Sequence, residues 1–491
     1  MILRFAFFVI NSIFFFFFFP INANAQEKWD LQKCVEYAWV NNISVQQSDI
    51  QARIAALSYQ QLKTSRYPNI NITNSTGTNF GRAVDPTSNL FVSNTLLFQQ
   101  YNLNVNGLIY NWGNTRNSII GARYASEAAN KDVERLKNDI GLTIATTYLQ
   151  VLLAKEQIKI TEKQMELTKS RLTDTRKRVD AGQLPELNAL ELEAQFARDS
   201  ATYIAAMMTE EQNLLTLKAT LNLDAATVFD IVEPPVDKIP VENIADLQPE
   251  VVYQTALQTQ PLQKVNDLRL KALQYNLKAA KSALYPSVNW FGGLGTNFSN
   301  PNIKISDVKF NGYQAPTLLS PIVNTGTGIF PILQPDLTVV QGKKSFNEMW
   351  TGWGTQINDN FRQNIGLQLS IPILNGGAAR TNYKRIQYDI QNAEWVKKQS
   401  DQRLKNDIYL AYQSAVNALN RYQASKKTKE LSEKSFTLAQ KRYDAGLLQP
   451  IEYITIQNNL FRANIQTAAD HFDYVFRMKV LEFYKGMGLR L

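Results

Sequence analysis

Apolar and polar residues alternate along one stretch near the middle of the second half of the chain. Ile365, Leu367, Leu369, Ile371 and Ile373 fall on one side, and Asn364, Gly366, Gln368 and Ser370 fall on the other. A period of two residues is typical of a β-strand with one apolar and one polar face. A weaker copy of the pattern covers residues 102–110. The pattern therefore predicts strands over 364–374 and 102–110.

Each of these strands leads directly into a long helical pattern that contains no proline. Over 116–181 and 378–445, apolar residues recur at steps of three and four, as in coiled coils. A helix over 116–181 would be roughly 100 Å long, at about 1.5 Å per residue. Each pattern is broken by a segment with glycine and proline, 182–185 and 446–450, and a second helix is expected to return over 186–221 and 451–484.

The whole plan occurs twice along the chain. Tyr67-Pro68 recurs as Tyr285-Pro286, at an offset of 218 positions, while the Arg-x-Asp-Ala-Gly segments ending at Gly182 and Gly446 are offset by 264. The offset grows only between the two strands of each half, so the second hairpin must carry a long insertion. We predict a first repeat over 26–249 and a second over 250–491. In the first repeat we expect, in order, a helix (29–65), a β-hairpin (69–110, with a loop over 81–100), long helices (116–221) and a proline-rich connector (224–249). In the second repeat we expect a helix (250–283), a hairpin (287–374, with an extended extracellular loop over 299–360) and long helices (378–484).

The N-terminus has the composition of a secretory signal. A short positive region at Arg4 precedes the apolar run 5–21, and Ala23-Asn24-Ala25 fits the cleavage pattern. We expect a signal peptide over 1–25, with a retained membrane anchor as the alternative. Cys34 is not at the cleavage point, so a lipid anchor there is not expected. No other apolar run reaches the roughly 20 residues that a spanning helix needs, so membrane insertion would have to use strands.

Composition excludes several classes of protein. The chain has 491 residues, with 52 basic and 43 acidic ones, and this thinly spread charge argues against a nucleic-acid partner. Cys34 is the only cysteine and His471 the only histidine. A disulfide within the chain, a cysteine-based metal site and a nucleophile–histidine pair are therefore not expected. We predict no enzymatic activity, no cofactor and no resident metal.

Four strands per chain impose an assembly if they span a membrane. An open sheet edge is not tolerated in lipid, and about eight strands are the usual minimum for a closed barrel. Two copies would supply eight strands and three copies twelve. The charged helices are too long to sit in the bilayer, so they would project into the periplasm. A non-pore periplasmic coiled-coil protein is the alternative, although it has no evident use for the two hairpins.

The two-fold repeat, the Tyr-Pro strand starts, the segment Gly366-Leu-x-Leu-Ser-Ile-Pro-Ile-x-Asn-Gly-Gly377 and the paired Arg-x-Asp-Ala-Gly turns resemble the TolC-like outer-membrane efflux proteins. The resemblance covers essentially the whole mature chain. It implies a mixed α and β membrane protein that forms a homotrimer: a twelve-stranded β-barrel in outer-membrane lipid, continued by a periplasmic α-barrel of coiled-coil helices. It also implies a Gram-negative outer-membrane location, a periplasmic adaptor and an inner-membrane transporter as partners, and passive export of either small molecules or secreted proteins.

The resemblance also suggests roles for particular residues at the periplasmic tip. The two turns would dock the adaptor, although both would also serve as ordinary helix C-caps. Glu452, six positions after the turn glycine, matches an acidic aperture position, where three carboxylates would select cations and raise one another's pKa; a solvated acid near a helix N-terminus is the alternative. Thr455 occupies a second position that is acidic in some members. Tyr443 matches a position that latches the closed state, or it simply packs. The docking turns comprise Asp180, Ala181, Gly182, Gln183 and Leu184, and Asp444, Ala445, Gly446, Leu447 and Leu448.

A third group of residues would mark the junction of barrel and tube. Glycines would give the chain conformational freedom there, and a proline suits the point where strand pairing ends. The candidates are Asn111, Gly113, Pro372, Asn375, Gly376 and Gly377. An aromatic belt near the strand ends would comprise Tyr110, Trp112, Trp290 and Phe298.

Overall fold

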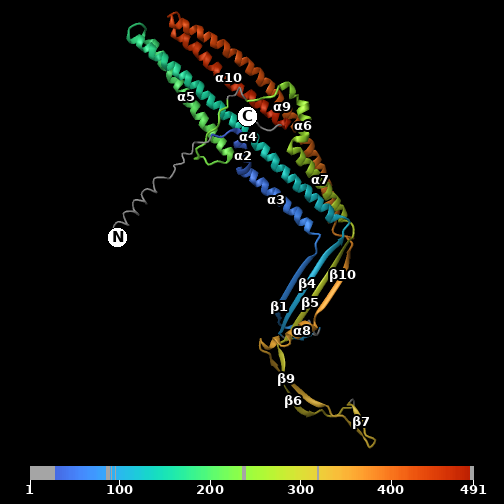
Figure 1. The fold of residues 1–491 in the computed structure, drawn as a ribbon. Helices are drawn as coiled ribbons and strands as arrows, with labels where there is room; N and C mark the ends of the chain where they lie inside the picture. Colours follow the sequence, from blue (N-terminus) through green and yellow to red (C-terminus); the bar gives the residue numbers. More distant parts are fainter. Residues whose placement is uncertain are drawn as a thin grey trace, which may run out of the picture. The chain divides into compact units, whose positions relative to one another are not determined.

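The computed structural model describes residues 28–84, 89, 91–93, 95–234, 239–317 and 320–486 (Figure 1). The expected signal peptide, 1–25, lies outside the described residues. The described chain divides into two compact units. A helical unit contains residues 28–59, 121–274 and 387–486, with the gap noted above, and a strand unit contains residues 60–120 and 275–386.

Four long helices dominate the helical unit. Helices α4 (Asn114–Asp180) and α9 (Ala378–Asp444) have 67 residues each, and α5 (Glu186–Leu221) and α10 (Pro450–Lys485), which return from them, have 36 each. The three- and four-residue steps of α4 form a buried stripe, in which Val151 and Ala154 are at most 2% exposed. This stripe joins residues of α2, α5 and α10 in one apolar core. None of the described helices is both long enough and apolar enough to cross a membrane.

The helix expected over 29–65 is in fact two helices, α2 (Leu31–Asn41) and α3 (Ile43–Thr64). Asn42 separates them with an extended backbone (ψ 125°). Its side-chain oxygen accepts a hydrogen bond from the backbone N–H of Ser44 at 2.9 Å, which caps the start of α3. Its side-chain nitrogen donates to the carbonyl of Thr220 at 3.1 Å. Asparagine at this position therefore ends one helix and starts the next.

The helix expected over 250–283 is also divided, into α6 (Pro249–Thr259) and α7 (Pro261–Ser282), after a short 3-10 helix, η2 (Ile244–Asp246). Gln260 has an extended backbone because the proline that follows it disfavours the α region. Pro261 also lacks the N–H that would continue the ladder of α6. The proline is visible in the sequence, so this break could have been predicted.

The segment after α5 is held on α4 by polar contacts. Ile231 forms a parallel bridge with Trp29, and the Tyr148 hydroxyl donates to the carbonyl of Val232 at 2.7 Å. Lys155 of α4, whose side chain is 13% exposed, bonds the carboxylate of Asp230 at 2.5 Å. These contacts fix the start of the predicted connector against the helical core.

The strand unit contains a four-stranded antiparallel sheet in the order β1-β4-β5-β10. The strands are β1 (Asn69–Asn79), β4 (Leu96–Tyr110), β5 (Ser287–Pro301) and β10 (Arg362–Ser370). Strand β10 ends earlier than expected, so Ile371 and Ile373 lie beyond it, and Pro372 cannot donate to a ladder. Strand β4 starts earlier than expected, inside the predicted loop 81–100, which also holds the short pair β2 (Arg82–Val84) and β3 (Phe91–Ser93).

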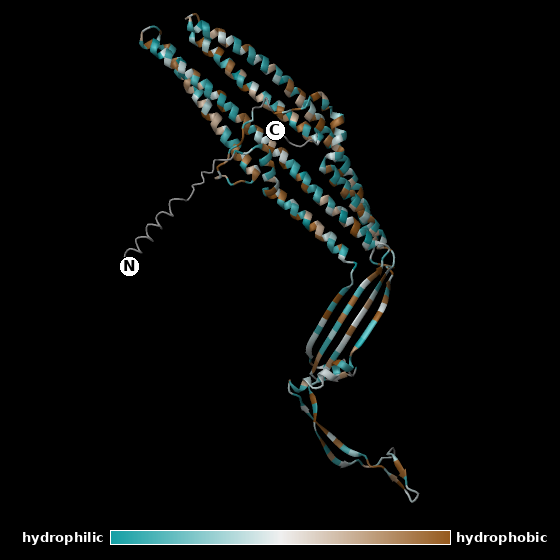
Figure 2. Cartoon of the chain, viewed as in Figure 1, coloured by the Kyte–Doolittle hydropathy of each residue, from teal (hydrophilic) through white to brown (hydrophobic). Residues whose placement is uncertain are grey.

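The register of the sheet separates apolar from polar side chains. Ile72 lies opposite Leu103, and Leu103 lies opposite Leu294. Leu367 lies opposite Trp290 in the same way. Figure 2 shows the resulting alternation along the strands. The apolar face comprises Ile70, Ile72, Leu103, Val105, Val288, Trp290, Leu294, Ile365, Leu367 and Leu369, whereas the opposite face is rich in amides and hydroxyls.

The predicted extracellular loop, 299–360, is not a structureless loop. It contains two hairpins, β6 (Ile303–Tyr313) with β9 (Pro335–Lys343) and β7 (Ile322–Asn324) with β8 (Ile329–Pro331), followed by η3 (Glu348–Trp350) and α8 (Trp353–Asp359). The segment 348–359 packs on the end of β5. Phe298 is fully buried there, stacked on Trp350 with ring centroids 5.6 Å apart. The expectation that Phe298 belongs to an exposed aromatic belt is therefore wrong.

Candidate functional site

The two turns that join the long helices have the same backbone geometry. Gly182 and Gly446 have φ values of +71° and +74°, which glycine adopts without steric cost. The N–H of Gln183 donates to the carbonyl of Arg178, and that of Leu447 to Arg442, each at 2.8 Å. These six-residue bonds satisfy carbonyls that the helix ends leave open, as in the Schellman motif. Both predicted docking turns are thus helix C-caps by geometry.

The side chains of the two turns are largely solvent-exposed. Of the ten predicted docking residues, only Leu184 and Leu448 are half-buried. Leu447 is 70% exposed, more than any other large apolar side chain of the two turns. A Cβ added at either turn glycine would meet no atom within 4 Å. The turns therefore present open backbone and one prominent leucine.

Beside the second turn, side chains from α4, α9 and α10 form one cluster. Arg171 of α4 bonds Asp444 at 3.0 Å, and its guanidinium lies over the ring of Tyr453, 5.6 Å from the centroid. Tyr443 stacks on Tyr453, with ring centroids 4.6 Å apart. The Tyr443 hydroxyl is 3.5 Å from that of Thr175. Tyr443, the predicted latch residue, thus joins the end of α9 to α4.

Two residues of this cluster, Arg171 and Tyr453, were not expected from the sequence. Tyr453 is 1% exposed, and burial raises the pKa of its phenol above the usual value. Glu452, its neighbour, is exposed in the first turn of α10. The chain therefore places an aromatic anchor and an exposed carboxylate at adjacent positions. No signal short of the tertiary packing distinguishes Tyr453 from other tyrosines.

A buried polar layer lies farther along the same helices. The carboxylate of Asp199 in α5 accepts hydrogen bonds from Thr168 of α4 at 2.7 Å and from Gln195 at 2.7 Å. Gln457 of α10 donates to the Thr168 hydroxyl at 2.9 Å. All four side chains are at most 5% exposed. This layer ties three helices together in one register, because breaking it would leave buried polar groups without partners.

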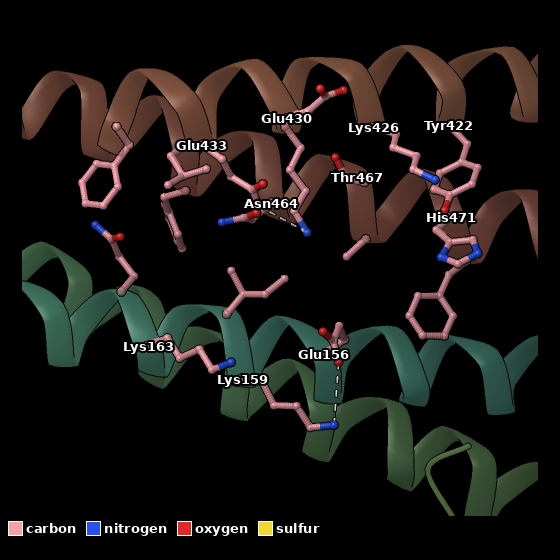
Figure 3. Close-up of a pocket in the computed structure, with 18 of the residues that line it drawn as sticks. Glu156, Lys159, Lys163, Tyr422, Lys426, Glu430, Glu433, Asn464, Thr467 and His471 are labelled. Carbon is pink, nitrogen blue, oxygen red and sulfur yellow. Dashed lines mark ion pairs between the residues drawn. The ribbon is translucent and has the colours of Figure 1, made fainter. Parts of the chain in front are cut away.

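A groove of about 990 Å³ runs between α4 on one side and α9 and α10 on the other (Figure 3). Its walls carry charges of both signs, including Lys159, Lys163, Lys426, Glu430 and Glu433. His471 lines it as well, stacked on Tyr422 with ring centroids 4.3 Å apart. Among the described residues there is no group of three or more histidine, cysteine, aspartate or glutamate side chains that could hold a metal ion.

The predicted junction residues lie between strand and helix, as two short turns. In the first, the side chain of Asn111 donates to the Thr115 hydroxyl at 2.8 Å, and Gly113 has a φ of +79°. Ser282 of α7 donates to the carbonyl of Trp112 at 2.8 Å, which ties α7 to this turn. The rings of Tyr110, Trp112 and Tyr285 pack in sequence here, with centroids 5.5 and 5.3 Å apart.

The second junction is more open. Pro372 follows the end of β10, and the carbonyl of Asn375 accepts a hydrogen bond from Ala378 at 3.3 Å. Gly376 and Gly377 have φ values of +63° and +78°. Two successive left-handed residues reverse the backbone direction sharply, and only glycine does so without strain.

Comparison with known proteins gives the family. The profile of the outer membrane efflux protein family matches residues 35–223 and 333–475. Pyoverdine export outer membrane protein OpmQ of Pseudomonas putida is 23% identical over 223 residues, which cover 44% of each chain. The match thus spans less than half the length of that relative. Two solved structures are similar over 94% of this chain: the Campylobacter jejuni CmeC outer membrane channel (17% identity, 86% of that chain, TM-score 0.68) and the outer membrane protein VceC of Vibrio cholerae (13%, 97%, 0.70).

The chain belongs to the outer membrane efflux protein family. The resemblance to the TolC-like proteins seen in the sequence is confirmed. The protein is located in the outer membrane and has a large helical part in the periplasm. The family is one of efflux channels, which are not enzymes.

Proposed function

We propose that three copies of this chain form a passive channel of a tripartite export system. The observation that carries the proposal is the sheet. It has an apolar face on all four strands, a polar opposite face, and, within the described residues, one unpaired edge on β1 and one on β10. Edges in lipid must be paired, so copies would join β10 to β1 and close a twelve-stranded barrel around a polar lumen.

The equal lengths of α4 and α9, and of α5 and α10, support the assignment of two repeats per chain. Three copies would then supply twelve long helices for a periplasmic tube. The exposed aromatic cluster Tyr110, Trp112 and Tyr285 at the strand ends suits the level where the barrel leaves the bilayer. A non-pore coiled-coil protein, the alternative from the sequence, has no use for such a sheet.

Conductance tests this proposal. Purified mature protein should migrate as a heat-resistant trimer and form small cation-selective channels in planar bilayers. A control protein without residues 60–120 and 275–386 should form neither. Monomers without conductance would contradict the proposal.

The two turns are the proposed docking sites for a periplasmic adaptor, which in turn contacts an inner-membrane transporter. Leu447 is the most exposed apolar residue there and would lie at the centre of such a contact. Leu447→Asp should abolish binding to a cognate periplasmic adaptor while leaving conductance unchanged. Leu431→Asp, at an exposed leucine within α9 and away from the turn, is the matched control. Equal adaptor binding by both variants would exclude the docking role.

The proposed cargo is a small molecule, and protein secretion is the second candidate. The similarity to OpmQ, named for pyoverdine export, supports the first. Efflux of a dye panel from cells that carry or lack the gene would separate the two, because a secretion channel would leave dye retention unchanged.

A further inference from the structure

Strands β6 and β9 form a two-stranded ribbon, and one face of it is apolar. Cross-strand pairs place Val308 opposite Val339 and Phe310 opposite Leu337. Ile305 lies on the same face, opposite Gln341. We call this the apolar ribbon face, and define it by Ile305, Val308, Phe310, Leu337 and Val339.

Two irregularities keep β6 aligned with this face. Apolar residues fall at 303, 305, 308, 310 and 313, so strict alternation is interrupted twice. The register shifts between Ile305 and Asp307, and again between Phe310 and Tyr313. Each β-bulge adds one residue and returns the next apolar side chain to the same face. Gly312, with a φ of +107°, lies in the second. The backbone irregularities and the apolar residues thus match position by position.

The opposite ribbon face is polar except for Val340, which lies opposite Asp307. Lys309 lies opposite Thr338, and Lys304 lies opposite Gly342. The side chain of Asn311 donates to the Thr338 hydroxyl at 2.6 Å. The ribbon is therefore amphipathic, which in a soluble sheet indicates that one face packs on a partner.

Within the described residues, the apolar ribbon face is exposed. Its five side chains have exposed fractions between 47% and 66%. Phe310 and Tyr313 contact each other edge to face, with ring centroids 5.3 Å apart, and Tyr313 is 64% exposed. A two-stranded hairpin alone is marginally stable in water, and a third strand or a packed layer is needed to support it.

The base of the ribbon is attached directly to the sheet. Asn302 alone separates β5 from β6, and its backbone bonds Thr95 (2.9 Å) and Lys344 (2.6 Å) on the neighbouring segments. Lys344 also donates to the side chain of Asn300 at 2.6 Å, and Lys304 pairs with Glu348 at 2.8 Å. The ribbon therefore starts at a fixed place at the end of the sheet.

We infer that the apolar ribbon faces of three copies pack against one another around the channel axis, at the extracellular end. This inference rests on the proposed trimer. An eleven-residue strand is about 36 Å long at 3.3 Å per residue. A barrel of twelve strands has a radius of only about 12 Å, from strands 4.8 Å apart and tilted by roughly 40°. Ribbons that start on one rim can therefore meet at the axis, and three-fold symmetry offers each the same partner.

Cysteine cross-linking in intact outer membranes tests the inference. The background is Cys34→Ala, which removes the one cysteine of the chain. Phe310→Cys reports on the apolar face, and Lys309→Cys, its neighbour on the polar face, is the matched control. Oxidation should link Phe310→Cys chains in pairs. Because one disulfide joins two chains and leaves the third chain of a trimer without a partner, up to about two of every three chains should be linked. Lys309→Cys should remain unlinked.

Labelling with a bulky maleimide is the second measurement. Phe310→Cys should react roughly tenfold more slowly than Lys309→Cys, since a packed interface excludes solvent. Equal labelling rates would overturn the inference. Slow maleimide labelling of both Phe310→Cys and Val308→Cys, with no disulfide cross-links in either, would also overturn the inference. The apolar ribbon face would then be covered by something other than a second copy of the chain. Native electrophoresis of the same samples separates the two proposals: loss of the trimer contradicts the channel, whereas an intact trimer without cross-links contradicts only the ribbon contact.

Discussion

The Arg171 guanidinium donates a hydrogen bond to the Asp444 carboxylate at 3.0 Å, although the two residues are 273 positions apart. The Arg171 side chain is 15% exposed, and that of Asp444 is 49% exposed. The pair joins the C-terminal part of α4 to the last residue of α9. It therefore holds the tip of one helical hairpin against the other.

Asp444→Asn should loosen this contact and favour separation of the two hairpins. Half-exposed ion pairs contribute about 0–1 kcal/mol, so the open population should rise by at most about fivefold. Single-channel recording would show this as a longer open time. Glu430→Gln, which removes exposed ion pairs with Lys427 and Lys434 inside α9, is the control. Identical open times in the two variants would show that Arg171 and Asp444 do not restrain the tip.

Replacement of Glu452 by glutamine should reduce cation selectivity if three copies of this carboxylate line an aperture. The reversal potential in a salt gradient measures the change. Glu186→Gln removes an acid from the first turn of α5, the other returning helix, and should have little effect. Unchanged selectivity for Glu452→Gln would leave the carboxylate as a solvated helix N-terminal residue.

Gly107 leaves space for the indole of Trp290, its cross-strand partner in the sheet. A Cβ at this position would overlap the Trp290 ring, so Gly107→Ala should destabilise the sheet by about 1–3 kcal/mol. The measurement is the temperature at which the oligomer dissociates in detergent. Gly354→Ala, where a Cβ meets no atom within 4 Å, should dissociate at the wild-type temperature. Trp290→Leu in the same chain should restore part of the loss; no restoration would place the cause elsewhere.

Acid should release the segment at Asp230 from α4. Burial alone would raise the pKa of Asp230, but hydrogen bonds from Lys155 and Lys28 outweigh it, and the pKa is lowered. A carboxyl with a lowered folded-state pKa contributes stability above its unfolded value of about 3.9 and loses it as the pH falls through the folded value. The protection of amides 224–234 against hydrogen exchange, relative to the rate of an unfolded chain at the same pH, should therefore fall below about pH 4.

Lys155→Met provides the matching change at neutral pH. It leaves the buried side of Asp230 without its cation, at a cost of about 1–3 kcal/mol, and exchange over 224–234 should already be fast at pH 7. Lys434→Met, at an exposed position of α9, is the control. Protection of amides 224–234 that is as high in Lys155→Met as in the wild type, and equal at pH 7 and below pH 4, would show that the apolar contacts alone hold this segment.

The long periodic elements could be predicted from the sequence because each depends on local spacing. Three- and four-residue steps define the buried stripe of α4, and alternation defines the apolar face of β10. The structure divides the helices predicted over 29–65 and 250–283 at Asn42 and Gln260. An asparagine that can cap a helix and Pro261 are the signals in the sequence that indicate these breaks. The insertion over 299–360 could be predicted from the repeat offset, but its strands could not, because two bulges interrupt the alternation that identifies a strand.

By itself, the sequence determined the long helices, the four strands and the two glycine turns, since these depend on periodicity and backbone preference within a few residues. Its resemblance to the TolC-like proteins, carried by the repeat and the paired motifs, indicated the class of protein. The tertiary structure alone decided that Arg171 meets Asp444, that Tyr453 is buried beside Tyr443, and that Phe298 is core rather than surface. Those contacts join residues far apart in the chain, and local spacing carries no information about which of many similar side chains will meet. The apolar ribbon face belongs to the same group, because only the paired register of β6 and β9 brings its five side chains to one side.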